Sequence, residues 1–205
     1  MKEELQKLPW SDVTTVKKIV TRQACWLVEG ACTCSYKYGR QFKFTSQAHF
    51  RHNKAPDFIC RLARQIETEL GLPEHWLNAC NGNAYLCPNH ELFLHKDDEK
   101  MFREAESPTS KRDVLICSLS YGAERNFIIL QDFKDKDTQQ IQIPSKDGDL
   151  ITMERRFQDN YKHGIEKANT SIASADSAFP NTVRYNLTFR RIQKHAKGCP
   201  CHATF

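Results

Sequence analysis

The chain has 205 residues, of which 40% are hydrophobic and 27% are charged, and its formal net charge is +5. This balance excludes a disordered chain and is typical of one sizeable globular domain. No apolar run reaches the roughly 18 residues that a membrane helix needs, so we expect no membrane partner. The N-terminal MKEELQKLPW lacks the apolar stretch of a secretory signal, which predicts an intracellular protein in the nucleus or cytoplasm; we expect a monomer.

Cysteine content and charge distribution narrow the expectations further. Nine cysteines is an odd number, so we expect free buried thiols or a metal site instead of a disulfide framework. Residues 17–64 contain ten basic and two acidic side chains, whereas residues 71–150 are acidic overall. An acidic middle between basic flanks favours a polyanionic partner, although a solvated surface of mixed charge gives the same composition.

The expected elements begin with short strands at 11–20 and 32–38, which are rich in β-branched and aromatic residues. A helix is predicted over 57–70, because apolar residues recur at helical spacing and Gly71 follows. Short extended segments separated by turn signals come next, at 78–86, 91–95, 113–121, 125–133, 139–144, 149–155 and 183–192. So many strands favour a β-sandwich or jelly roll behind an α/β N-terminal part.

Residues 95–99 read His-Lys-Asp-Asp-Glu and contain candidate metal ligands. In an extended chain, His95, Asp97 and Glu99 project from the same face. His163, after another expected strand, is a candidate third ligand. Two histidines and one carboxylate form the facial triad of non-haem Fe(II) oxygenases. A His-x-Asp pair alone is more often an ion pair or a capping group.

The last expected strand has one apolar and one polar face. Alternation places Tyr185, Leu187 and Phe189 on the first face, and the second face carries Arg184, Asn186, Thr188 and Arg190. Two arginines on one face of a packed strand require anionic partners. A dicarboxylate bound near a metal would satisfy both, and a solvated edge strand is the alternative.

Together these segments resemble the AlkB family of Fe(II)- and 2-oxoglutarate-dependent dioxygenases. The resemblance covers roughly residues 78–192 and is most specific in the segment Arg184-x-Asn-Leu-Thr-Phe-Arg190. It also rests on Asn83-x-Tyr85, His95-x-Asp97-Asp98-Glu99, residues 118–127, Gly148-Asp149-Leu150 and His163-Gly164-Ile165. The resemblance implies an α+β protein with a double-stranded β-helix (jelly roll) core at 78–192. Residues 1–77 would form an N-terminal α/β extension with a nucleotide-recognition lid, and 193–205 a Cys-containing tail.

The resemblance also implies roles for individual residues. Fe(II) would be held by His95, Asp97 and His163, with 2-oxoglutarate as cosubstrate and O₂ as oxidant. The cosubstrate would contact Asn83, Tyr85, Arg184, Asn186, Thr188 and Arg190, and Arg184 would pair with its distal carboxylate. The methylated base would meet Tyr36, Tyr38, Glu99 and Arg125. In this set Tyr38 would stack on the base, Tyr36 would help to line the pocket, Glu99 would favour a cationic base, and Arg125 would brace the pocket or contact the nucleic acid.

The implied activity is oxidative N-demethylation of bases such as N1-methyladenine and N3-methylcytosine. It couples decarboxylation of 2-oxoglutarate to base hydroxylation and formaldehyde release. No apolar wedge for invading a duplex is evident, which favours methylated single-stranded DNA or RNA as the partner. Two alternatives are a 2-oxoglutarate-dependent hydroxylase of a protein or other non-nucleic-acid substrate, and a non-catalytic nucleic-acid-binding module. Glu99 and Tyr38 argue against the first, and the complete ligand set argues against the second.

The C-terminal run Cys199-Pro-Cys201-His202 raises the prospect of a zinc site. Together with Cys32 and Cys34 it would supply four soft thiol ligands. The Cys-x-Cys spacing is tighter than in most structural zinc motifs, and a disordered tail is the alternative.

Overall fold

The computed structural model describes residues 1–38, 48–97, 99–102, 115–131, 139–154, 157–168 and 182–203. Its helices are α1 (Lys2–Gln6), α2 (Asp57–Leu70) and α3 (Phe157–Asn160), with 3-10 helices η1 (Lys100–Phe102) and η2 (Pro200–Ala203). Its strands are β1 (Ser11–Thr14), β2 (Val20–Val28), β3 (Tyr36–Tyr38), β4 (Ala48–Phe50), β5 (Asn53–Lys54), β6 (Ala79–Tyr85), β7 (Leu92–His95), β8 (Ile116–Gly122), β9 (Arg125–Gln131), β10 (Gln140–Ser145), β11 (Leu150–Met153), β12 (Tyr161–Ile165) and β13 (Arg184–Arg190).

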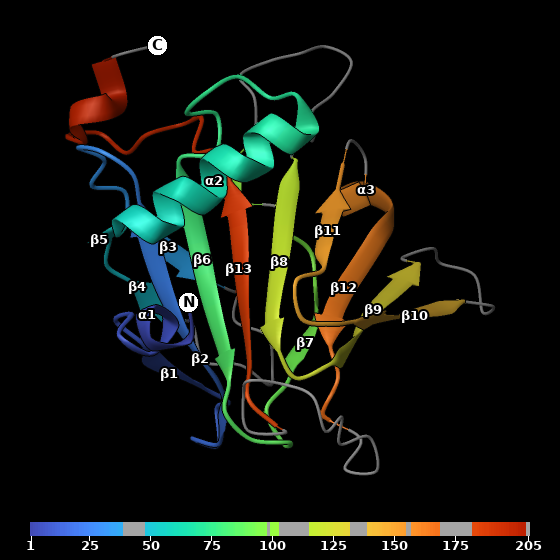
Figure 1. Cartoon of the computed structure of the whole chain (residues 1–205). Coiled ribbons are helices and arrows are strands. Elements are labelled where there is room, and N and C mark those ends of the chain that lie inside the picture. Colours follow the sequence, from blue (N-terminus) through green and yellow to red (C-terminus); the bar gives the residue numbers. More distant parts are fainter. Residues whose placement is uncertain are drawn as a thin grey trace.

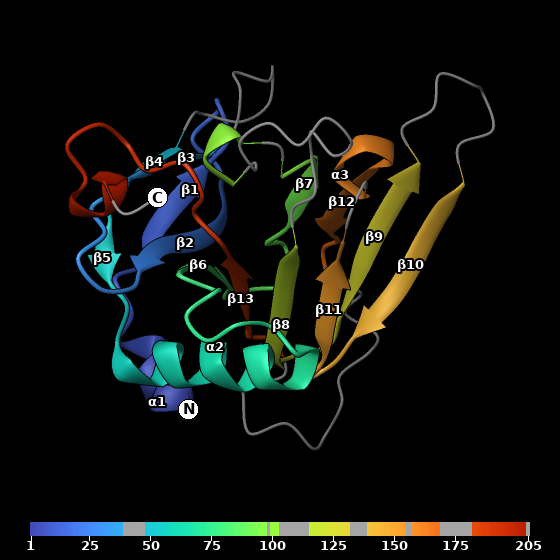
Figure 2. The same cartoon turned by 90° about the horizontal axis from the view of Figure 1, so that it is seen from above.

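Two largely antiparallel sheets form the core (Figure 1). The larger sheet has the order β1-β2-β6-β13-β8-β11, with β5 paired to β2, and the smaller sheet has the order β10-β9-β12-β7. Strands β3 and β4 form a separate pair. Seen from above, α2 runs along one face of the larger sheet, while β7 lies on the other side of β13 from α2 (Figure 2). This architecture confirms the predicted double-stranded β-helix core.

The α2 helix covers the apolar face of the larger sheet. Its buried residues include Ile59, Ala63 and Ile66, which join one hydrophobic cluster with the apolar face of β13. The helix ends at Gly71, which has a left-handed backbone with φ of +64°, as a C-terminal glycine allows. The predicted helix over 57–70 is therefore confirmed. Among the described residues, none of the helices combines the length and the apolar character needed to cross a membrane.

The N-terminal strands differ from the sequence expectation. The predicted strand at 11–20 is only β1 and its following turn, in which Lys18 has a φ of 61° and Thr15 N–H donates to the Ile19 carbonyl over 2.9 Å. The long strand is β2, which pairs with both β1 and β6. Residues 1–77 therefore share a sheet with residues 78–192. The predicted strand at 32–38 is extended only at β3.

The C-terminal segment packs against the rest of the fold. The backbone N–H groups of Gln193 and Lys194 both donate to the Met101 carbonyl, over 2.9 and 3.1 Å. The chain then reaches η2, where Cys199 is buried. The alternative of a disordered tail is therefore wrong for residues 193–203.

Candidate active site

Three potential metal ligands converge between the two sheets. His163 in β12 pairs directly with His95 at the end of β7, and Asp97 lies two residues further along the chain. The Nε2 atom of His95 is 3.4 Å from Asp97 Oδ1, and His163 Nε2 is 3.8 Å from Asp97 Oδ2. One ligand atom from each residue lies within 4.8 Å of the other two. The predicted triad is therefore assembled by strand pairing, with His95 half-buried and the other two ligands buried.

The surroundings prepare these side chains to bind a cation. His95 Nδ1 donates to the Phe93 carbonyl over 2.9 Å, which leaves Nε2 with its lone pair toward Asp97. Burial, with a contribution from the nearby His95, lowers the pKa of His163 to about 3, so this imidazole is neutral. Burial alone would raise the pKa of Asp97, but Arg190 and the two neighbouring histidines together outweigh burial and hold that pKa well below its usual range. The site therefore combines the neutral imidazole of His163, the carboxylate of Asp97 and the Nε2 atom of His95.

Two features outside the triad hold its geometry. The Asp97 N–H donates to the side-chain oxygen of buried Gln158 in α3 over 2.9 Å, and Lys96 donates to the Asp159 carbonyl over 2.8 Å. The glycine after His163 is a steric requirement. A Cβ on Gly164 would lie 2.5 Å from the Leu92 carbonyl oxygen, so a larger residue would force β12 and β7 apart.

The polar face of β13 lies opposite the triad across a narrow cavity. Register places Asn186 beside Asn83 and Thr188 beside Asn81 on neighbouring β6. Arg22 from β2 donates to Asn83 Oδ1 over 2.8 Å. Both sheets thus contribute to the cavity, whose lining includes Arg22, Asn81, Asn83, Leu92, His95, Asp97, Ser118, Phe127, Met153, His163, Gly164, Ile165, Asn186, Thr188 and Arg190.

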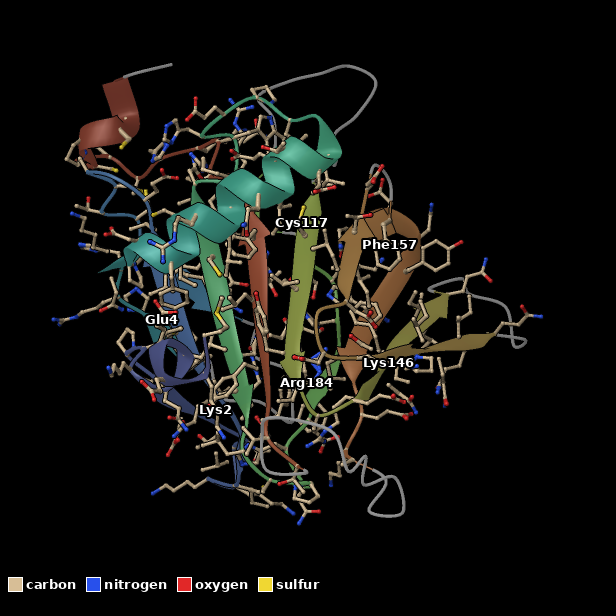
Figure 3. The ribbon with its side chains drawn as sticks, viewed as in Figure 1. Lys2, Glu4, Cys117, Lys146, Phe157 and Arg184 are labelled. Carbon is tan, nitrogen blue, oxygen red and sulfur yellow. The ribbon has the colours of Figure 1, made fainter. Side chains whose placement is uncertain are left out.

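Arg184, at the start of β13, is a buried cation with spare donors (Figure 3). Its Nη2 donates to the hydroxyls of Ser120 and Ser145 over 2.7 and 3.1 Å. Among the described residues, its Nε and Nη1 atoms have no hydrogen-bond partner, and neither does the hydroxyl of Tyr85, its register partner on β6. Burial lowers the pKa of Arg184 to about 10. Both side chains lie one step beyond the cavity lining on the same strand faces, so an anion reaching this end of the cavity would complete their hydrogen bonds.

A buried polar group joins the triad to β3. Arg190 donates from Nη2 to Asp97 Oδ2 over 2.6 Å and from Nη1 to the Tyr36 hydroxyl over 3.1 Å. The Tyr36 hydroxyl donates to Glu99 Oε1 over 2.7 Å. The second oxygen of Glu99 is buried and, within the described part of the chain, has no hydrogen-bond partner. Burial and the charge of Asp97 raise the pKa of Glu99.

The structure describes the side chains of Arg125 and Tyr36, two of the predicted base contacts, and leaves that of Tyr38 outside the described residues. Arg125 is buried, and its guanidinium donates to five backbone carbonyls, which belong to Cys87, Pro88, His90, Glu166 and Thr182. It therefore braces loops, in keeping with the first of the two roles predicted for it, and it is absent from the cavity lining. Tyr36 is also buried, stacked on Trp26, and reaches the site through its hydroxyl. Tyr38 belongs to β3, but its side chain lies outside the described residues.

Sequence reasoning missed two contributors to the site. Arg22 faces the cavity from β2 and shares its strand face with the buried apolar residues Ala24 and Trp26. Alternation along β2 places Arg22 on the same face as Trp26, and this pattern could have indicated its position. Because the strand is predicted at 11–20 instead of at Val20–Val28, the pattern is not seen. The other is Gln158, whose one-turn helix α3 leaves no sequence periodicity.

Comparisons with known proteins agree with this geometry. The family model described as 2OG-Fe(II) oxygenase superfamily matches residues 3–190. The chain belongs to this superfamily. It is 25% identical over 201 residues to the human protein named alpha-ketoglutarate-dependent dioxygenase alkB homolog 3, a match covering 95% of this chain and 61% of the relative. The bovine protein of the same name is 26% identical over 197 residues, covering 93% and 60%.

The chain thus spans about 60% of the length of these curated relatives, and their names confirm the resemblance to the AlkB family. A solved structure described as "The structure of OsALKBH1" superposes with a TM-score of 0.55 and 19% identity, covering 92% of this chain and 88% of that chain. At this identity it supports the fold alone.

The residues present fit the groups that this superfamily uses, Fe(II), 2-oxoglutarate and O₂. The His-Asp-His triad supplies the ligand set for non-haem Fe(II) and leaves coordination positions for other ligands. The unpartnered donors of Arg184 and Tyr85 match one carboxylate of a dicarboxylic acid. The triad therefore meets the first predicted requirement, and the unpartnered donors of Arg184 and Tyr85 meet the second.

Proposed function

We propose that the protein is an Fe(II)- and 2-oxoglutarate-dependent demethylase of methylated nucleic-acid bases, with cationic N1-methyladenine and N3-methylcytosine as its substrates. The observation that carries the proposal is Glu99. One of its oxygens accepts from Tyr36 and the other is buried with no partner among the described residues, two positions after Asp97. A buried carboxylate at this place favours a positively charged base over a neutral one.

The residues divide the work as follows. His95, Asp97 and His163 bind the iron, which supplies oxidation of the N-methyl group when the cofactors are bound. Arg184 and Tyr85 hold the distal carboxylate of 2-oxoglutarate, while Asn83, Asn186 and Thr188 line the space between that end and the metal ligands. Arg190 fixes the orientation of Asp97 by an ion pair. Once hydroxylated, the methyl group leaves as formaldehyde and the unmodified base remains.

Nucleic acid as the substrate class is supported by exposed positive charge outside the cavity. Lys17, Lys18, Arg51 and Lys54 are exposed in the N-terminal third of the chain. Such residues neutralise phosphates without reading sequence, so binding should weaken as salt concentration rises. We propose a single strand as the preferred form, because a base outside a duplex reaches a cavity between two sheets without the cost of unpairing.

The test is mass spectrometry of oligonucleotides after incubation with Fe(II), ascorbate and 2-oxoglutarate. The panel contains N1-methyladenine, N3-methylcytosine, N6-methyladenine and N1-methylguanine, each in single- and double-stranded DNA and RNA. We expect loss of the methyl group from the two cationic bases, in single strands first, with stoichiometric succinate and formaldehyde. Succinate formation without demethylation of any oligonucleotide would overturn the proposed substrate class in favour of a protein or other hydroxylation substrate.

A further inference from the structure

A second group of metal-binding side chains lies away from the cavity, where the segment between β2 and β3 meets the C-terminal segment. It comprises Cys32, Cys34, His195 and Cys199, and one ligand atom from each lies within 4.8 Å of all the others. Cys32 and Cys34 belong to the segment between β2 and β3, whereas His195 and Cys199 precede η2. The C-terminal segment lies beside the segment after β2 in both cartoon views (Figures 1 and 2).

The distances within this group match a tetrahedral ion. The Nδ1 atom of His195 is 3.6 Å from the Sγ atoms of Cys32, Cys34 and Cys199. The Sγ atoms of Cys32 and Cys199 are 3.8 Å apart. With Zn–S bonds of about 2.3 Å and a Zn–N bond of about 2.0 Å, a regular tetrahedron sets S···N at about 3.5 Å and S···S at about 3.8 Å. Four protein ligands therefore surround a point at zinc-bonding distance from each.

The backbone around the group is arranged for thiolates. The Thr33 N–H donates to Cys199 Sγ over 3.4 Å, and the Ala196 N–H donates to Cys34 Sγ over 3.3 Å. Hydrogen bonds from the backbone to sulfur stabilise the deprotonated ligands of a metal site. None of the nine cysteines, all of which lie in the described residues, forms a disulfide, and three sulfurs with one imidazole around a common point are not the pattern of a disulfide.

We propose that Cys32, Cys34, His195 and Cys199 bind one structural Zn²⁺ ion that joins the segment before β3 to the C-terminal segment. Three thiolates and one imidazole form a closed Cys₃His set, with no position left for a substrate. This ligand set replaces the one expected from sequence, in which Cys201 was the fourth ligand. His195 takes that place because its Nδ1 is equidistant from the three sulfurs.

The position of this site suggests what it does for the cavity. The Cys34 carbonyl accepts from Trp26 Nε1 over 2.8 Å, and Trp26 stacks on Tyr36 with ring centroids 4.8 Å apart. Tyr36 comes two residues after Cys34 and donates to Glu99. The ion would thus anchor the start of β3 and keep the Tyr36 hydroxyl at Glu99. This role makes Cys34 a positioning residue.

The test measures the metal directly, and it uses a His95→Ala background so that the triad does not contribute zinc of its own. Purified under reducing conditions, this variant should contain one equivalent of zinc by mass spectrometry of the metal. Adding Cys199→Ser or Cys32→Ser should remove that zinc. Adding Cys87→Ser, a half-buried cysteine outside the group, should leave it unchanged. Cys201→Ser should also leave it unchanged.

Cobalt provides a readout of the site with all four proposed ligands in place, so it does not depend on whether a cysteine variant folds. Co²⁺ replacing Zn²⁺ in the His95→Ala protein should give the intense visible bands of a tetrahedral ion and a thiolate-to-cobalt charge-transfer band. His195→Ala should shift these bands, because a nitrogen ligand is lost, whereas Cys201→Ser should not. Absence of bound zinc and of tetrahedral cobalt bands would overturn the proposal, as would zinc content that survives loss of Cys32 or Cys199. Because metal content is read without substrate, this outcome is independent of the proposed demethylase activity.

Discussion

The two groups of metal-binding side chains in this molecule are built in opposite ways. The triad of His95, Asp97 and His163 comes from paired strands and contributes three ligands of nitrogen and oxygen. The cysteine–histidine group comes from the irregular segment between β2 and β3 and the irregular segment before η2, and it contributes four ligands, three of them sulfur. Three hard or borderline ligands leave coordination positions open for reactants, whereas four ligands including thiolates close the site.

The comparison teaches which property should depend on each group. A site for chemistry needs fixed geometry, which the β12–β7 pairing and the buried Arg190–Asp97 ion pair supply before any cofactor binds. A site that links distant segments needs only to hold them together. The four ligands of the cysteine–histidine group lie outside helices and strands, so no backbone pairing fixes their positions without the ion. We therefore expect loss of the first to abolish turnover with little change in stability, and loss of the second to lower stability and disturb the Tyr36–Glu99 contact while the metal triad stays intact.

The largest expected effect comes from the triad itself. His95→Ala and His163→Ala should each abolish demethylation and 2-oxoglutarate turnover, because two remaining ligands do not hold Fe(II) for the reaction. The melting temperature should stay closer to that of the wild type for His95→Ala than for His163→Ala, because His95 lies at the end of β7 and its side chain is 12% exposed, against 5% for His163. Succinate release measures the loss, and His52→Ala, an exposed histidine, is the matched control. Substantial turnover in either variant would exclude that histidine as a ligand.

Arg184→Ala should weaken cosubstrate binding without removing the metal ligands. Truncating one partner of a buried charge pair costs on the order of 2–5 kcal/mol. The Michaelis constant for 2-oxoglutarate should therefore rise at least about 30-fold, and high 2-oxoglutarate should partly restore the rate. Arg191→Ala, whose guanidinium instead lies over the Trp76 ring, is the control and should keep a normal constant. An unchanged constant in Arg184→Ala would show that the cosubstrate binds elsewhere.

Loss of the cysteine–histidine group should act on stability. Cys34 and His195 are 161 residues apart in sequence, so an ion that joins them closes a very long loop. A cross-link of this span contributes on the order of 4 kcal/mol, which corresponds to roughly 8–16 °C in melting temperature for a domain of this size. Thermal melts of Cys199→Ser against Cys87→Ser measure the difference. Equal melting temperatures in the two variants would show that the cysteine–histidine group does not stabilise the fold.

The contrast between the groups also explains what the sequence predicted. The polar face of β13 follows from strict alternation over seven residues, and the helix over 57–70 follows from its apolar spacing and Gly71. Both signals are local, so the sequence carries them in full. His95 and Asp97 are neighbours in sequence, so predicting the triad required only the distant ligand His163, and the resemblance to a known family indicated that residue.

Other features depend on the path of the chain and leave no local signal. His195 is an ordinary histidine in a polar segment until the fold places it against three sulfurs. Arg125 and Arg184 are both arginines in β-strands, yet one is surrounded by five carbonyls and the other has spare donors. The sequence predicts a functional role for both. Only their partners in the folded protein distinguish Arg125, which holds loops together, from Arg184, which has donors left for a ligand.

Gly164→Ala tests whether strand packing sets the geometry of the triad. The new Cβ would lie 2.5 Å from the Leu92 carbonyl oxygen, so β12 must shift against β7 and His163 moves from its place opposite His95. We expect Fe(II) affinity to fall by roughly 10- to 100-fold, measured by titrating activity with iron. Gly71→Ala introduces strain at a left-handed position with open space around it, and it should lower stability while iron affinity stays unchanged. Equal iron affinity in the two variants would contradict the packing argument.

Glu99→Gln is the smallest and most selective change. The amide keeps an oxygen that accepts from the Tyr36 hydroxyl and removes the negative charge beside Asp97. Opposite charges about 4 Å apart interact by roughly 1–4 kcal/mol, depending on burial. The kcat/KM for N1-methyladenine and N3-methylcytosine should therefore fall at least about fivefold, while any rate on neutral N6-methyladenine or N1-methylguanine stays close to the wild-type value.

Two measurements separate this charge effect from damage to the site. Succinate formed without nucleic acid should persist in Glu99→Gln, because the metal and cosubstrate residues are intact, and Glu69→Gln, an exposed acid on α2, should match the wild type throughout. An equal loss on cationic and neutral bases would indicate that Glu99 acts through Tyr36 and the position of β3. No loss on any base would remove the cationic substrates from the proposal, because Glu99 is the carboxylate on which that choice of base rests.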